Sequence, residues 1–293
     1  MSSSSTIELF APAKLNLCLE VLGRRPDGYH EIDSLVQAVD LCDRIRLERA
    51  DAIHFEVHGE APAGRHNLAW RAADLLGVGA RIVLHKRIPP GSGLGGGSSD
   101  AAAVLHGLNR LYGLGHAPAA LAEMGARLGA DVPFFLHGGA ARCRGVGERV
   151  EPLPDPPPGT RFLLLLPPVR METKRVYGAL QAPLTGSPEV AKFFSRIYFG
   201  KEGPLRAPFF NRLQEVAEGL EPRLGRLRRE AETACGAAFT MTGSGSAYFA
   251  AWGTGDSPLG DRWDARGLRC RLQVVRALGS GEASSPGGRC GHH

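Results

Sequence analysis

The stretch Pro89-Pro90-Gly91-Ser92-Gly93-Leu94-Gly95-Gly96-Gly97-Ser98-Ser99-Asp100 runs directly into an alanine-rich segment. It places five glycines within seven residues, so backbone N–H groups can line a concave surface without side chains in the way. The two serines are predicted to open a helix, over residues 99–112, whose unpaired N–H groups and dipole favour an anion. The stretch therefore predicts a phosphate-binding loop at a helix N-terminus.

Two familiar glycine motifs do not describe this loop. No Gly-Lys-Ser or Gly-Lys-Thr follows the glycines, so the stretch is not a P-loop. Gly91, Gly93 and Gly96 match the spacing G-x-G-x-x-G, but a dinucleotide-binding unit needs a strand directly before the glycines and another after the helix. Here two prolines precede the glycines, and a second helical pattern follows the first. A flexible loop without a ligand is the plainer alternative, and the helix beside the glycines argues against it.

The composition narrows the class of protein. With 293 residues the chain has room for two domains, and its 43% hydrophobic and 22% charged residues are ordinary for a globular protein. The net charge of +5 is mild, and no basic run is interleaved with aromatics, so we expect a small anionic substrate and no nucleic acid. The strongest apolar run, Phe162–Leu166, is too short to span a bilayer. Six scattered cysteines are typical of reduced thiols, so we expect a cytoplasmic protein with no membrane partner.

A proline-dense segment, 151–159, is the best candidate for a linker. It predicts an N-terminal domain over residues 1–158 and a C-terminal domain over 159–279, followed by a Gly- and Ser-rich, disordered tail over 280–293. Apolar periodicity predicts strands and helices in both domains. The strands are expected at 7–10, 15–21, 43–47, 53–57, 80–85 and 162–166, the helices at 67–76, 99–112, 117–128, 173–180 and 213–233, and a strand–glycine–strand unit at 238–251.

Lys14 and Asn16 lie two residues apart in a predicted strand. They share one face, opposite the apolar Leu15 and Leu17. An ammonium beside an amide can hold a substrate hydroxyl and a phosphoryl group in transfer. On periodicity alone, a solvated strand face is the better interpretation.

Asp131 lies in unusually apolar surroundings, between a glycine and Val-Pro-Phe-Phe. It is either a helix N-cap, whose carboxylate accepts backbone N–H bonds, or a buried carboxylate that needs a partner. Lys14 is a candidate partner. The residues alone leave this choice open.

Two further segments follow turn-forming residues. Tyr29 and His30 come after a Pro-Asp-Gly turn, where they could stack on a base and hydrogen-bond its edge, although a decorated hairpin is the more common case. Residues 241–247, Met-Thr-Gly-Ser-Gly-Ser-Ala, form a second glycine turn. By default this turn is only a strand connection.

Taken together and in order, the motifs resemble those of the GHMP kinases. The matching segments are Pro12-Ala-Lys-Leu-Asn-Leu17, the glycine stretch 89–102, Ala130-Asp-Val-Pro-Phe-Phe135 and Thr242-Gly-Ser-Gly-Ser246. The resemblance covers roughly residues 7–251, and the chain beyond about residue 253 matches nothing in it. It implies an α+β, two-domain fold, with an N-terminal domain like domain 2 of ribosomal protein S5 and a ferredoxin-like α/β-plait C-terminal domain. The active site is expected between the two domains.

The resemblance implies an ATP-dependent kinase. Within the superfamily, Arg25-Pro-Asp-Gly-Tyr-His-Glu-Ile32 and the triple glycine before Ser98 are similar to members that phosphorylate the 2-hydroxyl of a cytidine diphosphate ester of methylerythritol, in the non-mevalonate route to isoprenoids. The alternatives are another kinase of the superfamily, acting on mevalonate, homoserine or a sugar, and a non-catalytic metabolite-binding protein on the same fold. The last should have lost Lys14 or Asp131, and both are present.

The resemblance also implies a role for each motif residue. Asp131 would orient or deprotonate the acceptor hydroxyl, and Lys14 would neutralise charge beside it. ATP and Mg²⁺ are the expected cofactors, with Ser99 the candidate metal ligand because no acidic ligand stands out. The small cytidine diphosphate substrate is the expected partner of a monomer or homodimer. The ATP-binding candidates are Asn67, Pro89, Gly91, Gly93, Leu94, Gly95, Gly96, Gly97, Ser98 and Ser99, and the substrate-binding candidates are Asn16, Tyr29, His30, Thr173, Tyr177, Gly243 and Ser244.

Overall fold

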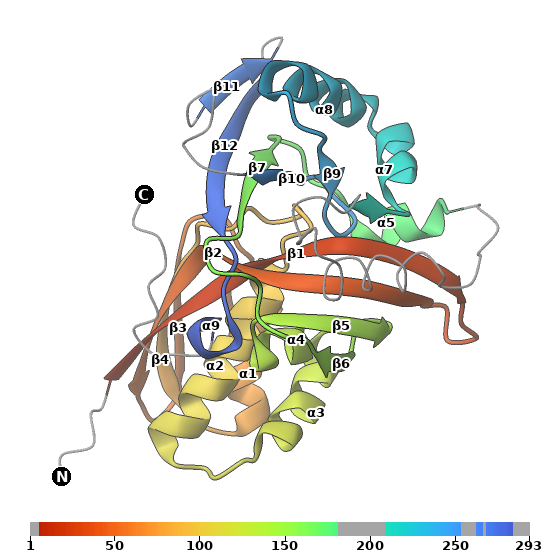
Figure 1. The fold of residues 1–293 in the computed structure, drawn as a ribbon. Helices are drawn as coiled ribbons and strands as arrows, with labels where there is room; N and C mark the ends of the chain where they lie inside the picture. Colours follow the sequence, from red (N-terminus) through yellow and green to blue (C-terminus); the bar gives the residue numbers. More distant parts are fainter. Residues whose placement is uncertain (1–5, 181–208, 253–261, 266–267, 284–293) are drawn as a thin grey trace.

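The computed structural model describes residues 6–180, 209–252, 262–265 and 268–283. Within these ranges the strands form two sheets, of seven and five strands. Helices cover the outer face of each sheet, and the inner faces of the sheets pack against each other (Figure 1). This mixed arrangement agrees with the α+β fold expected from the sequence.

The first sheet has the order β3-β4-β2-β1-β8, and β5 joins it through β2 and carries β6. Its long central hairpin, β1 and β2, extends well beyond the helices that cover the sheet (Figure 1). The strands are β1 (Thr6–Arg24), β2 (His30–Arg49), β3 (Ile53–His58), β4 (Ala80–His85), β5 (Ala140–Gly145), β6 (Arg149–Pro152) and β8 (Phe210–Asn211). The helices on this sheet are the 3-10 turn η1 (Gly64–His66), α1 (Leu68–Leu76), α2 (Gly96–Tyr112), α3 (Pro118–Leu128) and α4 (Val132–His137).

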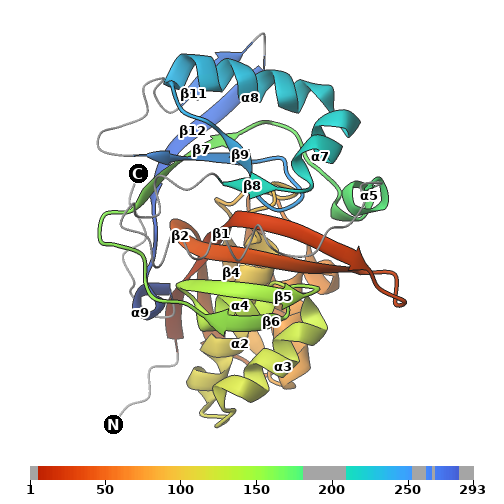
Figure 2. The ribbon, with the colours of Figure 1, turned by 45° about the vertical axis from the view of Figure 1, so that its right-hand side comes forward.

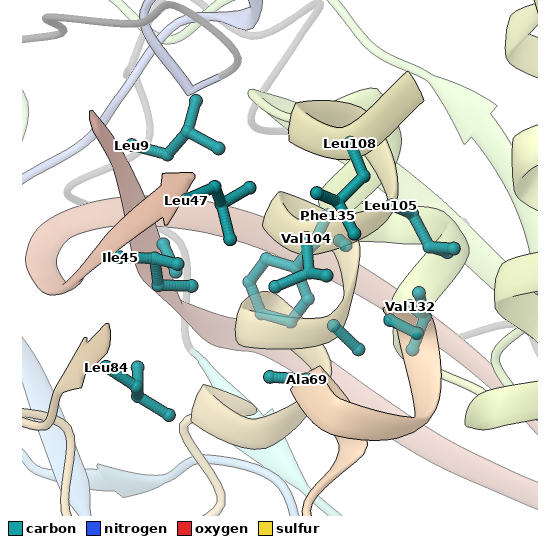
Figure 3. Packing of buried hydrophobic residues seen from close by; sticks show 14 of the residues in the cluster. Leu9, Ile45, Leu47, Ala69, Leu84, Val104, Leu105, Leu108, Val132 and Phe135 are labelled. Atoms are coloured by element: carbon teal, nitrogen blue, oxygen red, sulfur yellow. The ribbon is translucent and has the colours of Figure 1, made fainter. Parts of the chain in front are cut away.

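The helix α2 lies closest to the sheet, and its apolar stripe makes the core (Figure 3). Val104, Leu105 and Leu108 pack with Leu47 of β2, as the periodicity predicted. Gly107 allows this close approach, because a Cβ there would lie 2.5 Å from the Leu47 and Leu9 methyl carbons. This close contact seats the C-terminal half of α2 against β1 and β2.

The second sheet has the order β11-β12-β7-β10-β9. Its strand β7 is an unbroken apolar run because both faces are covered: Phe162 and Leu164 face the first sheet, while Leu163 and Leu165 face the helices. The strands are β7 (Arg161–Leu166), β9 (Thr240–Met241), β10 (Tyr248–Trp252), β11 (Arg262–Ala265) and β12 (Leu268–Arg276). The remaining helices are α5 (Thr173–Gly178), α7 (Gln214–Leu220), α8 (Pro222–Cys235) and α9 (Ser280–Ala283).

Two expectations about the chain ends and loops need correction. The phosphate-loop helix begins at Gly96, not at residue 99, because Gly95 takes a left-handed conformation (φ 75°) and caps it. Residues 280–283, assigned to a disordered tail, form α9, where the Ser280 N–H donates to Asp155 (2.7 Å); residues 284–293 lie outside the described residues. The chain beyond residue 253, which matched no motif, contributes β11 and β12 to the second sheet.

The proline-dense segment lies between β6, which ends the consecutive strands of the first sheet, and β7 of the second. The chain then returns to the first sheet, because β8 pairs in parallel with β1 (Figure 2), and it returns again after β12, where Ala277 forms a bridge with Val39 of β2. The division at residues 158 and 159 therefore stays a prediction. The described cysteines Cys18, Cys143, Cys235 and Cys270 are free, as expected of reduced thiols. No described helix is long and apolar enough to cross a membrane.

Candidate active site

Lys14 and Asn16 of β1 lie in the interior. Each is only 4% exposed, so the interpretation of their strand face as solvated is wrong. The glycine turn at residues 242–246 covers this face, and a Cβ on Gly243 would lie 3.2 Å from the Lys14 Nζ. The Lys14 ammonium donates a hydrogen bond to Asn16 Oδ1. A buried ammonium held in this way is a fixed positive charge.

The Asn16 side chain is held by hydrogen bonds to other parts of the protein. Its Oδ1 also accepts from the Gly243 N–H (2.9 Å), and its Nδ2 donates to Ser34 Oγ (2.8 Å). Its backbone N–H donates to Thr242 Oγ1 (3.0 Å). Asn16 thus joins β1, β2 and the second glycine turn, and it positions the lysine beside it.

The glycine stretch is held through its carbonyl groups. The oxygens of Gly91, Ser92 and Leu94 accept backbone hydrogen bonds of 2.9, 3.0 and 3.0 Å from Met171, Ala247 and Lys14 respectively. The first N–H groups of α2, from Gly96 onward, have no partner within the helix. The loop therefore has its carbonyls bound to the protein and a row of donors left at the helix N-terminus, which suits a phosphate group.

The two glycine turns meet above Lys14. Gly93 has φ of 79°, and a Cβ on it would lie 2.1 Å from the Thr242 carbonyl oxygen. A side chain at either turn would force the two backbones apart. The second glycine turn is therefore part of the site, which is more than the strand connection expected by default.

Asp131 immediately precedes α4 at its N-cap position, but its carboxylate makes no capping hydrogen bond. Its negative charge reaches two other groups. Burial lowers the pKa of Lys14 and the charge of Asp131 opposes that shift, while burial and then the charge of Asp131 raise the pKa of Tyr177. In the described chain Asp131 and Lys14 form no ion pair within 4.0 Å. The charge of the Asp131 carboxylate thus acts on both Lys14 and Tyr177, and the carboxylate is not used to cap α4.

The candidate cytidine-binding residues gather beside this group. The His30 ring lies 5.2 Å from the Tyr177 ring, centroid to centroid, and links the long hairpin to α5 (Figure 2). Thr173 Oγ1 and Ser244 Oγ are 2.9 Å apart and share a hydrogen bond. Tyr29, directly before β2, is 66% exposed, more than any other large hydrophobic residue described. The start of β2, α5 and the 242–246 turn therefore lie together, and Tyr177 of α5 lies within reach of the Asp131 charge.

Comparison with known proteins agrees with this geometry. The model of the GHMP kinases N terminal domain matches residues 67–139. A 4-diphosphocytidyl-2-C-methyl-D-erythritol kinase from Pelotomaculum thermopropionicum is 41% identical over 254 residues, which are 83% of this chain and 88% of the relative. The chain belongs to the 4-diphosphocytidyl-2-C-methyl-D-erythritol kinases. It is therefore a kinase, as the motifs predicted.

Two further comparisons extend the match for this kinase family. The relative from Thermus thermophilus is 40% identical over 288 residues and covers 95% of this chain, so the match continues beyond residue 253. A crystal structure of a 4-(cytidine 5'-diphospho)-2C-methyl-D-erythritol kinase superposes with a TM-score of 0.71 at 37% identity, over 92% of this chain and 99% of that one. A mevalonate kinase structure shares the fold alone, with a TM-score of 0.62 at 14% identity.

In this kinase Asn67 is the N-cap of α1. Its Oδ1 accepts from the Ala69 N–H (2.9 Å), and its Nδ2 donates to the Pro62 carbonyl (2.9 Å). The side chain thus shapes the segment that leads into α1. A contact with adenine at this position stays a prediction.

A buried charged cluster below the glycine stretch was missed by the sequence reasoning. Lys86 Nζ contacts Asp43 and, at 2.7 Å, Asp100. Burial raises the pKa of Asp100 to about 8, because Lys86 offsets its desolvation only in part. Burial lowers the pKa of Lys86, but the charges of Asp100 and Asp43 outweigh it and the pKa is raised. Lys86 and Asp100 flank the glycines in sequence and could have been noticed; Asp43 has no such signal.

Proposed function

We propose that this chain transfers the γ-phosphoryl group of ATP to the 2-hydroxyl of 4-diphosphocytidyl-2-C-methyl-D-erythritol, in the methylerythritol phosphate route to isoprenoids. One observation carries the proposal: the uncapped Asp131 carboxylate lies within electrostatic reach of both Lys14 and Tyr177. Lys14 links Asp131 to the phosphate loop, and Tyr177 links it to the cytidine-binding candidates. Membership of the kinase family supports the same acceptor.

In the proposed reaction the acceptor oxygen bonds to the γ-phosphorus, the bond from that phosphorus to the β–γ bridging oxygen breaks, and ADP leaves. Asp131 orients the hydroxyl and accepts its proton as the new bond forms. Lys14 supplies a fixed positive charge beside the phosphoryl group, where negative charge develops. Phosphoryl transfer depends mainly on positioning and charge neutralisation, so one carboxylate, one ammonium and a backbone cradle are a sufficient set.

The remaining candidate residues divide into those that would bind ATP and those that would bind the cytidine substrate. The stretch from Pro89 to Ser99 would hold the ATP phosphates, with Asn67 beside the adenine. Tyr29 would stack on the cytosine and His30 would hydrogen-bond its edge. Thr173, Tyr177, Gly243 and Ser244 would complete the acceptor pocket, while Asn16 acts through Lys14 and the Gly243 turn.

Ser99 fits a Mg²⁺ ligand. It is 1% exposed, and its Oγ has no hydrogen-bond partner in the described part of the chain. Magnesium prefers oxygen ligands and retains several waters. No group of three or more His, Cys, Asp or Glu side chains able to hold a metal occurs among the described residues, so phosphate oxygens and water would complete the shell. When bound, the ion would neutralise charge on the phosphates.

We further propose that residues 1–158 and 159–279 act as two domains with the active site between them. The first would supply Lys14, Asp131 and the phosphate loop, and the second Thr173 and the 242–246 turn. Because one chain supplies every proposed residue, a monomer would be sufficient, and a homodimer would leave the site unchanged. The expected location is the cytoplasm, without a nucleic-acid or membrane partner.

The proposal is tested by ATP consumption with Mg²⁺ and each of four acceptors: the cytidine compound, mevalonate, homoserine and galactose. Turnover with the cytidine compound alone is expected. Turnover with another acceptor would assign the chain to a different reaction of the superfamily. No turnover with any of the four, while ATP still binds, would contradict the proposed acceptor.

Replacing Tyr29 by alanine is expected to raise the KM for the cytidine substrate about tenfold or more, because stacking on a base contributes roughly 1–3 kcal/mol. Stability should not change, since Tyr29 is exposed. Tyr29→Phe keeps the ring and should retain the KM within about threefold, which makes it the control. An unchanged KM in Tyr29→Ala would refute the stacking assignment.

Replacing Gly97 by alanine should move stability and ATP affinity in opposite directions. A Cβ at this exposed position meets only Leu68, at 3.8 Å, and alanine in a helix is favoured over glycine by about 0.5–1 kcal/mol. The melting temperature should therefore rise. The KM for ATP should increase about tenfold, because the added methyl group would occupy the space of the phosphates. An unchanged KM would show that ATP does not bind against this turn of α2.

A further inference from the structure

The Lys86 cluster lies between the two ends of the glycine stretch. Lys86 directly follows β4, and its side chain is 6% exposed. Its partners Asp43, on β2, and Asp100, on α2, are 0% and 1% exposed. Three ionisable side chains this deeply buried demand close pairing, because an unpaired charge in the interior is very costly.

Asp43 holds the beginning of the stretch. Its Oδ2 contacts Lys86, and its Oδ1 accepts the backbone N–H groups of Arg87 (2.5 Å) and Ile88 (2.9 Å). Residues 87 and 88 lead directly into Pro89. A single carboxylate thus fixes the path of the chain as it leaves β4 and enters the loop.

Asp100 holds the end of the stretch. It lies near the start of α2, and its Oδ2 accepts from Lys86 Nζ at 2.7 Å. The lysine packs closely under the first turn, since a Cβ on Gly96 would lie 3.1 Å from its Nζ and 2.9 Å from Ile88 Cγ2. The first turn of α2 is therefore seated on Lys86 and Ile88.

We propose that Lys86, Asp43 and Asp100 form a buried clamp that holds both ends of the glycine loop in its ATP-binding shape. The three are positioning residues, because they act on ATP through the backbone of residues 89–97. The inference rests on the proposed function, in which this loop binds the ATP phosphates. Loosening the clamp should weaken ATP binding without altering the acceptor site, whose proposed residues lie on β1, at the start of β2, before α4, on α5 and in the 242–246 turn.

Asp100→Ala is the most informative variant. It leaves Lys86 paired with Asp43, so one positive and one negative charge remain in balance and the fold should persist. The clamp, however, loses its contact with α2. The KM for ATP should rise about tenfold, while the KM for the cytidine substrate and kcat stay within about threefold. Asp100→Asn still offers an oxygen to Lys86 and should restore the KM for ATP to within about threefold.

A matched control is Asp33→Asn, which alters another buried aspartate of β2, one bonded to Arg142 at 2.8 and 2.6 Å. It should leave the KM for ATP unchanged. If Asp100→Ala does not fold, Asp43→Asn makes the same test from the other end: its amide oxygen can still accept from Arg87 and Ile88, while its NH₂ group faces the ammonium. The expected result is again a raised KM for ATP alone.

The outcomes separate the clamp from the proposed ATP site. A raised KM for ATP in Asp100→Ala, restored in Asp100→Asn, supports the clamp. An unchanged KM in Asp100→Ala, with a raised one in Gly97→Ala, refutes the clamp and keeps the loop as the ATP site. Unchanged values in both variants refute the ATP site itself. A rise in both KM values together with a fall in kcat and in melting temperature, not restored in Asp100→Asn, would show a general structural role. That result would overturn the proposal.

Discussion

Replacing Asp131 by asparagine is expected to lower kcat by about 10³-fold, because a positioned carboxylate that takes a proton contributes 10²–10⁴-fold in rate. Asparagine keeps the shape of the side chain and can still contact the hydroxyl, but it cannot accept a proton. ATP binding should stay within about twofold, since the proposed phosphate contacts come from the glycine loop and α2. Stability should change little, because the Asp131 carboxylate makes no capping hydrogen bond to α4.

Two measurements check the Asp131 prediction. Steady-state ADP release gives kcat, and calorimetric titration with ATP gives the affinity of the variant. A loss of ATP binding together with turnover would assign Asp131 a structural role. A kcat within about tenfold of the unaltered enzyme would leave it as an orienting group only, since removing a general base costs more than that.

Replacing Lys14 by methionine is expected to lower kcat by about 10²–10³-fold, the usual cost of removing one group that stabilises charge in the transition state. Stability should rise in the same variant. Burial lowers the pKa of Lys14, so the ammonium is less favourable in the folded chain than in water, and below that pKa it disfavours folding. Methionine removes this penalty, and Asn16 Oδ1 keeps its bond from the Gly243 N–H.

Thermal melting and kcat, measured on the same preparation of Lys14→Met, test whether stability rises while kcat falls. The pH profile adds a second check. A lysine whose pKa lies below its ordinary value of 10.5 loses its proton earlier as pH rises, so kcat should fall along an alkaline limb below that pH. The residual activity of Lys14→Met should lack this limb. A melting temperature that falls together with kcat would show that Lys14 is needed for folding.

The local features of this fold were predictable from the sequence. The helix α1 runs from its cap at Asn67 to Gly77, which has φ of 67°, as the apolar pattern and the glycine indicated. The glycine stretch also predicted a loop that leads into a helix N-terminus, because conformational freedom and an adjacent helix start are properties of neighbouring residues. The error at the start of α2 arose from the same rule, since glycine can take helical angles as readily as loop angles.

The strand containing Lys14 shows where local patterns fail. Alternation along β1 separates two faces, but it does not say what covers each of them. The polar face is buried because the 242–246 turn packs onto it, through Asn16 and Gly243. No pattern in β1 itself could reveal that contact.

The sequence by itself determined the kinase family, and it supplied the candidate phosphate loop and catalytic residues, because each depends on short motifs and their order. Only the tertiary structure decided that Lys14 is buried, that Asn16 serves to position it, and that Asp43 meets Lys86 and Asp100. Burial and charge pairing depend on segments that are distant in the chain. They come together only when the two sheets and their helices pack.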